Sequence, residues 1–290
     1  MKFPQFSYTK PASLSQALQI LADGGDDVVP IAGGQSLLAG LSMRIAYPRM
    51  LVDLAGLPDL KGIRHDPRTN MVVIGAMTRH VEVANSPVIR EHLPLLTDAM
   101  KLVAHVAVRN RGTLGGSLAY ADPAAEMPAC AVALDATLTI AGATGTRIVR
   151  ARDFFTGLLE TDLRAGELIL DVRYPVPGSG HLHAILEFSR RAGDFAQAGV
   201  VVAAKVQRAT LSDPCFVYFG CVDRARVAAK VGQLLAGRPF PLSAPAGLDE
   251  AVAAEIQPSD SPGSRADTKA EWARVLTRRV MKTLSEKAVP

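Results

Sequence analysis

VRNRGTLGGSLAYADPAAEMPA, residues 108–129, is the most informative segment of this chain. Its glycines Gly112, Gly115 and Gly116 are interleaved with the hydroxyl residues Thr113 and Ser117. Glycines at this density permit positive φ angles and let backbone N–H groups approach a ligand closely, and the hydroxyls add further donors. A stretch of this kind can wrap phosphate oxygens without a dedicated cation. An ordinary glycine-rich loop would explain the glycines but not the hydroxyls between them.

A second segment of the same kind, AGGQS at residues 32–36, follows an apolar run near the N-terminus. No Gly-Lys-Ser/Thr follows it and the GxGxxG spacing is absent, so it is neither a P-loop nor a dinucleotide fingerprint. It is either a tight turn whose amides and Ser36 hydroxyl face a pyrophosphate, or a plain turn between a strand and a helix. Two such segments in one chain predict two grips on one elongated, phosphate-bearing cofactor.

Together with RRAGDFAQAGVVVA at residues 190–203, these segments resemble the FAD-binding medium subunits of the molybdenum hydroxylases. That family includes the flavoproteins of carbon monoxide dehydrogenase and xanthine dehydrogenase, and the resemblance covers nearly the whole chain. It implies an α+β fold with a two-subdomain, PCMH-type FAD-binding region over residues 1–176, divided into about 1–56 and 57–176. A small C-terminal domain like that of the carbon monoxide dehydrogenase flavoprotein, a three-stranded antiparallel sheet with helices, would occupy residues 177–290.

Hydrophobic spacing and turn residues predict the elements independently of any resemblance. The first fifth of the chain alternates strands and helices, which favours a small parallel unit, whereas the later strands are mostly antiparallel. Thr78 is expected to cap one short helix, Ser86-Pro87 to begin another, and residues 175–180 to form a linker. Ser13 is expected to cap a first helix, which begins at Leu14 and is stopped by Gly24-Gly25. The other expected helices are 37–43, 95–103, 124–134, 225–236, 248–256 and 268–286; the strands are 28–32, 50–54, 60–63, 71–75, 136–141, 146–150, 167–174, 182–189, 198–207 and 215–222.

The resemblance implies the residues that would bind FAD. They come from the two glycine-rich segments, the acidic residues that follow the second one, and one apolar position: Ile31, Ala32, Gly33, Gly34, Gln35, Ser36, Leu37, Thr113, Leu114, Gly115, Gly116, Ser117, Asp122, Glu126 and Ile169. Glu126 would lie beside the sugar chain of the flavin and Ile169 against the flavin. Asp122 has an alternative reading as an N-cap with Pro123 in the first helical turn. Arg109 and Arg111 are expected to have structural roles, such as bonding loop carbonyls.

One segment departs from the family pattern. The resemblance places residues 190–196 near the isoalloxazine side of the site, at the junction with the C-terminal domain. Just upstream, many relatives carry an aromatic residue or a lysine near the ring, where this chain has Ala184, Ile185, Leu186 and Glu187. The residue that stacks on the ring therefore stays unassigned.

The composition is that of a globular protein: 290 residues, 48% hydrophobic and 21% charged, with a net charge of +4. Arginine and lysine are scattered, which gives no case for nucleic acid. The N-terminus has no secretory h-region and no run reaches the length of a membrane span, so we expect a cytoplasmic protein. Cys130, Cys215 and Cys221 are interpreted as small buried hydrophobes, and His181 and His183 lack the further ligands of a metal site.

No nucleophile–base pair, acid pair or metal cluster is evident in the sequence, so the chemistry would belong to the flavin. The resemblance implies that a substrate is hydroxylated at a molybdenum cofactor on a large subunit. Electrons would pass through two [2Fe–2S] clusters on a small subunit to this FAD and then to an external acceptor. The complex would be a heterotrimer, as a dimer of heterotrimers. Two alternatives stay open: a stand-alone flavin-dependent oxidase or reductase, and a non-catalytic scaffold subunit.

Overall fold

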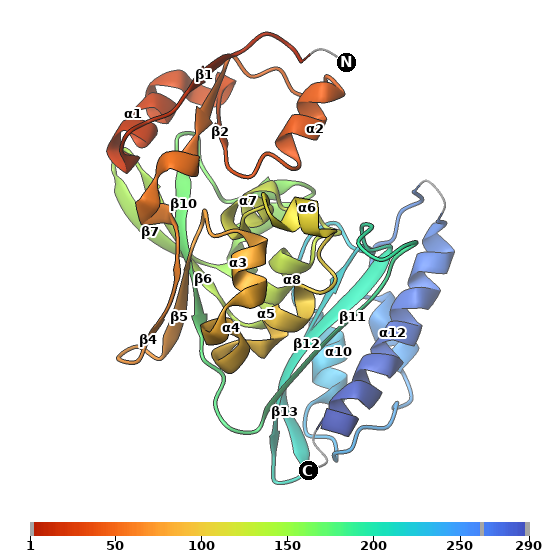
Figure 1. Ribbon diagram of the computed structural model, residues 1–290. Coiled ribbons are helices and arrows are strands. Elements are labelled where there is room, and N and C mark those ends of the chain that lie inside the picture. The colour runs from red at the N-terminus through yellow and green to blue at the C-terminus, as the bar shows by residue number, and fades with distance from the viewer. Residues whose placement is uncertain (1–2, 262–263, 288–290) are drawn as a thin grey trace.

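The computed structural model describes residues 3–261 and 264–287, and four β-sheets organise this part of the chain (Figure 1). Their strand orders are β1-β3-β2, β4-β5-β10-β6-β7, β8-β9 and β11-β12-β13. Helices lie between the second and fourth of these sheets and on the outer side of the fourth (Figure 1). The mixture of helices with largely antiparallel sheets confirms the α+β class.

The N-terminal sheet is the predicted parallel unit. Its strands β2 (Val28–Ile31) and β3 (Met50–Asp53) pair in parallel, and β1 (Ser7–Thr9), which the sequence pattern did not indicate, adds to the other edge of β3. α1 (Leu14–Gly24) begins where the Ser13 hydroxyl accepts the Gln16 N–H at 3.2 Å, and α2 (Leu37–Ser42) follows the first glycine-rich segment. Ala17 and Leu21 of α1 pack on the sheet and make a small core of their own.

The five-stranded sheet is antiparallel throughout. It consists of β4 (Ile63–Asp66), β5 (Met71–Gly75), β10 (Leu168–Pro175), β6 (Thr137–Gly142) and β7 (Gly145–Arg150). Its apolar residues pack against short helices in the largest core of the chain. These helices are α3 (His80–Asn85), α4 (Pro87–His92), α5 (Pro94–Ala99), α6 (Val106–Arg109), α7 (Leu114–Tyr120), α8 (Glu126–Ala133) and α9 (Ala151–Phe154). The two-stranded ribbon β8 (Phe155–Gly157) and β9 (Glu160–Thr161) joins this region to β10.

Three expectations for this region were wrong in detail. The first hairpin strand begins after Gly62, which has φ +105°, so it spans 63–66 rather than 60–63. The Thr78 hydroxyl bonds the backbone of Gly62 instead of capping α3, whose N-cap is Arg79. The helix expected over 95–103 ends at Ala99, and residues 100–102 form turns before Ala104, whose φ is +41°. Ser86 does cap α4, as predicted.

The C-terminal sheet has one edge strand that begins earlier than expected. β11 (His181–Phe188), β12 (Ala198–Gln207) and β13 (Thr210–Phe219) form an antiparallel meander. The sequence pattern predicts this third strand at 215–222, whereas it begins at Thr210 and includes Pro214. β13 pairs only with β12, and a register shift between Ala203 and Lys205 accommodates the proline on that edge. The helices α10 (Ala229–Leu235), α11 (Leu248–Ala253) and α12 (Ala266–Lys287) complete this part.

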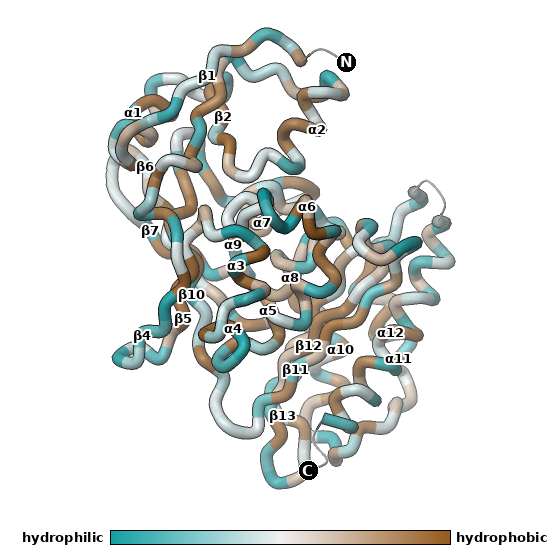
Figure 2. The backbone as a smooth tube through the Cα atoms, viewed as in Figure 1, coloured by the Kyte–Doolittle hydropathy of each residue, from teal (hydrophilic) through white to brown (hydrophobic). Residues whose placement is uncertain are grey.

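Both faces of the C-terminal sheet are covered. Leu182, Ala184 and Leu186 of β11 face the core under α12 and α10, whereas Ile185 faces the core shared with α5 and α8. Hydrophobic residues accordingly follow the strands of this sheet, while the exposed turn between β4 and β5 is hydrophilic (Figure 2). On the inner face, α8 packs against β12 and β13, and its first residue, Glu126, lines the site described next.

Candidate functional site

A cavity of about 980 Å³ lies where the N-terminal sheet, α7 and the start of the C-terminal sheet meet. Its lining includes the turn after β2, the start of α7, the turn between β9 and β10, the start of α8 and the loop between β11 and β12, together with residues from 76–80 and 103–108. Ligand sites fall in the range of about 300–1,000 Å³, so this cavity suits a large ligand.

The two glycine-rich segments touch each other in this cavity. A Cβ at Gly33 would lie 2.2 Å from the carbonyl oxygen of Arg111 and 2.8 Å from the Cα of Gly112. A Cβ at Gly116 would lie 2.8 Å from the Thr113 hydroxyl oxygen and 3.4 Å from the Cβ of Ala32. Real Cβ atoms do not approach backbone this closely, so glycine is required for the segments to meet. The predicted two grips therefore form one continuous wall.

The two segments differ in the donors that they offer. The second is not a loop but the beginning of α7, with Thr113 as N-cap accepting the Gly116 N–H. The N–H groups of Leu114 and Gly115 donate to the carbonyls of Thr78 and Ala76, so the protein itself uses them. In the first segment, by contrast, the hydrogen bonds recorded across the described residues leave the N–H groups of residues 34–36 without an acceptor. The turn after β2 is thus the part of the wall with backbone donors available for an anion.

Two acidic residues, Asp122 and Glu126, also line the cavity. The Asp122 carboxylate accepts the Ala124 N–H at 2.9 Å, which makes a turn before α8; the N-cap of α8 itself is Ala125. Burial raises the pKa of the Asp122 carboxyl. Glu126, the first residue of α8, is 7% exposed, and burial, together with the charges of Glu187 and Asp122, raises its pKa to about 8. Glu126 is therefore a buried acid in the cavity wall.

His80 is a lining residue that the sequence did not indicate. It is 6% exposed, and neither imidazole nitrogen has a hydrogen-bond partner among the described residues. Burial lowers the pKa of His80 to about 4; the backbone of Thr113 opposes this shift, and the charge of Arg109 adds to it. A neutral imidazole with two unpaired nitrogens on a cavity wall is a polar group that a ligand could satisfy.

Replacing His80 with asparagine is expected to reduce the loss of stability that the protein suffers on acidification. The unfolded chain takes up a proton near pH 6.5 and the native imidazole only near pH 4, so native stability falls as pH decreases between these values. From pH 7 to pH 5 the wild type should lose about 2 kcal/mol more than His80→Asn. Urea unfolding at both pH values measures this difference. Equal losses in the two proteins would contradict the prediction.

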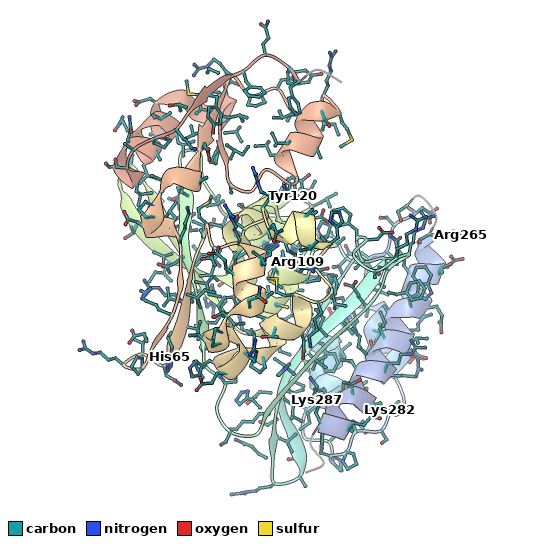
Figure 3. The ribbon with its side chains drawn as sticks, in the orientation of Figure 1. His65, Arg109, Tyr120, Arg265, Lys282 and Lys287 are labelled. Atoms are coloured by element: carbon teal, nitrogen blue, oxygen red, sulfur yellow. The ribbon has the colours of Figure 1, made fainter. Side chains whose placement is uncertain are left out.

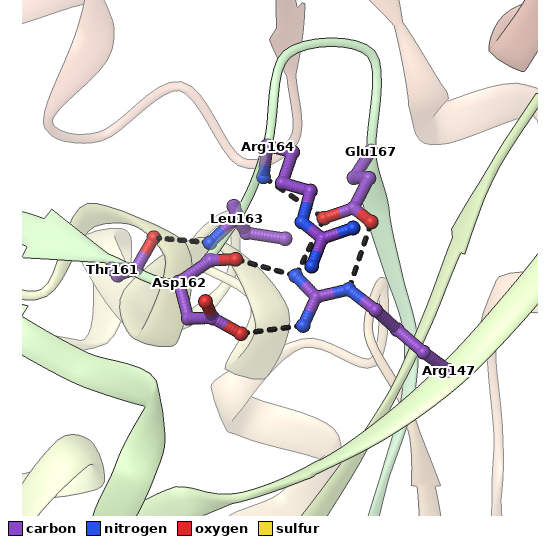
Figure 4. Close-up of polar contacts among 6 residues, drawn as sticks. All are labelled: Arg147, Thr161, Asp162, Leu163, Arg164 and Glu167. Atoms are coloured by element: carbon purple, nitrogen blue, oxygen red, sulfur yellow. Dashed lines mark hydrogen bonds and ion pairs between the residues drawn. The ribbon is translucent and has the colours of Figure 1, made fainter.

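The turn between β9 and β10 is held by an ionic cluster (Figure 4). Arg147 of β7 donates to both carboxylate oxygens of Glu167, at 2.8 and 2.7 Å, and to the carboxylate and carbonyl of Asp162. Glu167 also accepts the Arg164 N–H at 2.9 Å. Because residues 163–168 line the cavity, Arg147 fixes the shape of one wall from outside it.

Replacing Arg147 with methionine is expected to lower the free energy of unfolding by about 1–2 kcal/mol, because partly exposed charge-assisted bonds are lost and Glu167 keeps only Arg164 as a nearby positive charge. Arg150→Met is the control, since Arg150 lies at the end of the same strand and its ion pair with Asp153 is exposed on both sides. The control should change stability by less than about 0.5 kcal/mol in the same urea titration. Equal effects of the two substitutions would show that the cluster does not anchor the turn.

The far end of the cavity is closed by the loop between β11 and β12. Gly193 in this loop has φ +84°, and a Cβ there would lie 3.0 Å from the carbonyl of Ala104. Arg109 donates to the carbonyls of Val103 and Ala104 at 2.7 and 2.6 Å, which confirms the structural role predicted for it (Figure 3). Loop 190–197 thereby contacts the N-terminal region and lines the cavity. Its expected place near the isoalloxazine stays a prediction.

Most residues predicted from the sequence line this cavity. They are Ala32, Gly33, Gly34, Gln35, Ser36, Leu37, Thr113, Gly115, Gly116, Ser117, Asp122, Glu126 and Ile169. Ile31 and Leu114 do not; the Leu114 side chain is completely buried in the core behind α7. Sequence reasoning missed His80 and residues 163–168, whose segments carry no motif and reach the cavity only through tertiary packing.

Three other features of the chain are its cysteines, its potential metal ligands and its longer helices. Cys130 and Cys221 are buried thiols, whereas Cys215 is only partly buried. The described residues include no group of three or more His, Cys, Asp or Glu side chains placed to hold a metal ion. Within residues 3–261 and 264–287, no helix combines the length and apolarity needed to cross a bilayer.

Comparison with known proteins gives a consistent result over the whole chain. A profile of the FAD binding domain in molybdopterin dehydrogenase matches residues 4–177, and one of the CO dehydrogenase flavoprotein C-terminal domain matches residues 183–284. The glyceraldehyde dehydrogenase medium chain of Sulfolobus acidocaldarius is 35% identical over 98% of this chain and 97% of its own.

Solved structures agree. Carbon monoxide dehydrogenase of Hydrogenophaga pseudoflava, in a form lacking the Mo-pyranopterin moiety, contains a chain with a TM-score of 0.94 and 33% identity, covering 99% of each chain. Quinoline 2-oxidoreductase from Pseudomonas putida 86 contains one with a TM-score of 0.89 and 35% identity, covering 100% of each chain. The chain therefore belongs to the FAD subunits of the molybdenum hydroxylases, oxidoreductases in which the molybdenum and iron–sulfur cofactors lie on other subunits.

Proposed function

We propose that the cavity holds one FAD and that this chain is the electron-transfer subunit of a heterotrimeric molybdenum hydroxylase. FAD would supply the redox chemistry, taking electrons from two [2Fe–2S] clusters on a small subunit and delivering them to an external acceptor. The substrate would be hydroxylated at a molybdenum cofactor on a large subunit, in a cytoplasmic complex built as a dimer of heterotrimers. The protein's own work is to bind and orient the flavin.

The observation that carries this proposal is the direct contact of Gly33 with the backbone of Arg111 and Gly112 in the cavity wall. This contact joins two segments that are far apart in the sequence into one binding surface. Two further features fit a flavin dinucleotide: the donor-rich turn at residues 34–36 and the unpaired nitrogens of buried His80. An anionic pyrophosphate suits the former, and a polar atom of the ligand suits the latter.

Each part of FAD would be bound by lining residues of matching chemistry. The N–H groups of residues 34–36 and the Ser36 hydroxyl would bind the pyrophosphate, with the Ser117 hydroxyl as a further donor. Glu126 would meet a hydroxyl of the sugar chain, with Asp122 beside it. Ile169, which is 6% exposed, would offer an apolar surface to the flavin. We also propose that the FAD-binding region ends at residue 176, a division supported by the segments that the two family profiles match.

An affinity pull-down of the chain from its native host tests the proposal, with an absorption spectrum and metal analysis of the eluate. We expect a larger and a smaller partner, a flavin absorption band, iron and molybdenum. The large partner is then where the substrate contacts should be sought.

Two outcomes would contradict the proposal. A chain that arrives alone, yellow and metal-free, and yet turns over a substrate is a stand-alone flavin oxidase or reductase. A colourless chain that takes up no FAD is a non-catalytic scaffold.

A further inference from the structure

Two acids from different parts of the fold, the buried Glu126 and the partly buried Glu187, meet beside the cavity. Glu126 begins α8, and Glu187 lies on β11, on the face of the C-terminal sheet that packs against α5 and α8. The two carboxyl groups are close enough to interact with each other. The Oε2 atom of Glu187 is buried and has no hydrogen-bond partner within the described residues.

The surroundings offer these acids no counter-charge. Asp122, on the turn before α8, adds a further negative charge near Glu126, and the Cys130 thiol lies one turn farther along the same helix. On the β11 side, the Ser189 hydroxyl lies beside Glu187, but it donates its hydrogen bond to the carbonyl of Arg191 at 3.1 Å. Neither acid forms an ion pair with any lysine, arginine or histidine of the described residues.

Two carboxylates cannot both ionise at low cost in such a place. Burial disfavours each charge, and the first negative charge opposes the second, so the pair titrates as a unit and keeps a proton to higher pH than either acid would in water. The pKa of each carboxyl is raised, chiefly by burial. A shared proton also supplies the hydrogen bond that the buried Oε2 of Glu187 otherwise lacks.

We propose that Glu126 and Glu187 form a carboxyl pair carrying one proton at neutral pH, and that Glu187 is a positioning residue. By sharing this proton it keeps Glu126 able to donate a hydrogen bond to an oxygen of the ligand's sugar chain. It also keeps one negative charge out of a cavity that receives an anionic pyrophosphate. The inference rests on the proposed function, because the ligand is the FAD assigned to this cavity.

Infrared spectroscopy of the full chain tests the shared proton without flavin. The wild type should show the carbonyl stretch of a protonated carboxylic acid at pH 7, and this band should disappear as the pH is raised to 9.5. In Glu187→Gln the band should disappear at lower pH, since the neighbouring charge is gone. In Glu187→Lys it should be absent at pH 7, because the ammonium group stabilises ionised Glu126. Glu91→Lys, a substitution of a side chain that is 74% exposed on α4, is the charge-matched control and should match the wild type.

Titration of the flavin-free full chain with FAD between pH 6.5 and 9.5 tests the positioning role. The wild-type Kd should rise about tenfold across this range, because the pair loses its proton and the hydrogen-bond donor with it. Glu187→Lys should vary less than about twofold, and Glu91→Lys should follow the wild type. A Glu187→Lys profile that matches the wild type, or a wild type without the carboxylic acid band at pH 7, would overturn the inference. A chain that shows the band but binds no FAD at any pH would instead overturn the proposed function and leave the shared proton established.

Discussion

Replacing Gly33 with alanine is expected to produce a folded chain that no longer retains FAD. The added methyl group would lie 2.2 Å from the Arg111 carbonyl oxygen, so the turn after β2 and the start of α7 must move apart. Overpacking of this kind costs up to about 3 kcal/mol. We expect the two segments to relieve this strain by separating, which displaces the groups that bind the pyrophosphate. FAD affinity should then fall about a hundredfold. Flavin fluorescence titration of the full chain measures this loss directly.

The control for this substitution is Gly40→Ala. Gly40 lies in α2, directly after the same glycine-rich turn, and a Cβ there meets nothing within 4 Å. Alanine is a better helix former than glycine by about 1 kcal/mol, so this variant should bind FAD as the wild type does and unfold no more easily. Unchanged FAD affinity in Gly33→Ala would show that the two glycine-rich segments do not act as one grip.

Substitutions at Gly115 are expected to destabilise the FAD-binding region itself. A Cβ there would lie 2.5 Å from the Cβ of Ala76 and 2.8 Å from its carbonyl oxygen, which accepts the Gly115 N–H. α7 would have to move away from the end of β5 and lose that hydrogen bond. We expect Gly115→Ala to lower the free energy of unfolding by about 2 kcal/mol, after the gain in helix propensity, and Gly115→Val by about 3 kcal/mol or more.

Urea unfolding followed by circular dichroism distinguishes this packing effect from the difference in helix propensity between glycine and the larger residues. Gly40→Val, which adds the same side chain where space is open, should cost no more than about 1 kcal/mol. A graded loss from alanine to valine at residue 115, with little loss at residue 40, is the expected pattern. Equal losses at the two positions would show that close contact between α7 and β5 does not limit residue 115.

The proposed function gives the positions of these glycines a common reason. Gly33 lets the turn after β2 meet the backbone of residues 111 and 112, and Gly115 lets α7 lie directly on the end of β5. Gly112 and Gly116 leave room for the neighbouring side chains of His80, Thr113 and Ala32. The result is a cavity whose shape depends on main-chain contacts. Arg147 and the buried acids then set the charge and rigidity of the remaining walls.

Local chemistry in the sequence determined much of the fold. Ser13 and Ser86 cap the helices that they were predicted to cap, since the capping bond spans only three residues. The parallel N-terminal unit and the antiparallel strands that follow were evident from hydrophobic spacing and turn residues. Most of the predicted site residues were found because glycines and hydroxyls concentrate in two short segments and resemble a known family.

The tertiary structure alone decided how these segments combine. That Gly33 touches the backbone of Arg111, that Arg147 holds the turn before β10, and that Glu187 faces Glu126 depend on which faces of distant elements pack together. The strand that carries Pro214 illustrates the same limit, because an edge position tolerates a proline that a central strand would not. His80 likewise became a candidate only when packing left its nitrogens buried and unpaired. Burial and pairing are properties of the packed state, so local sequence patterns do not encode them.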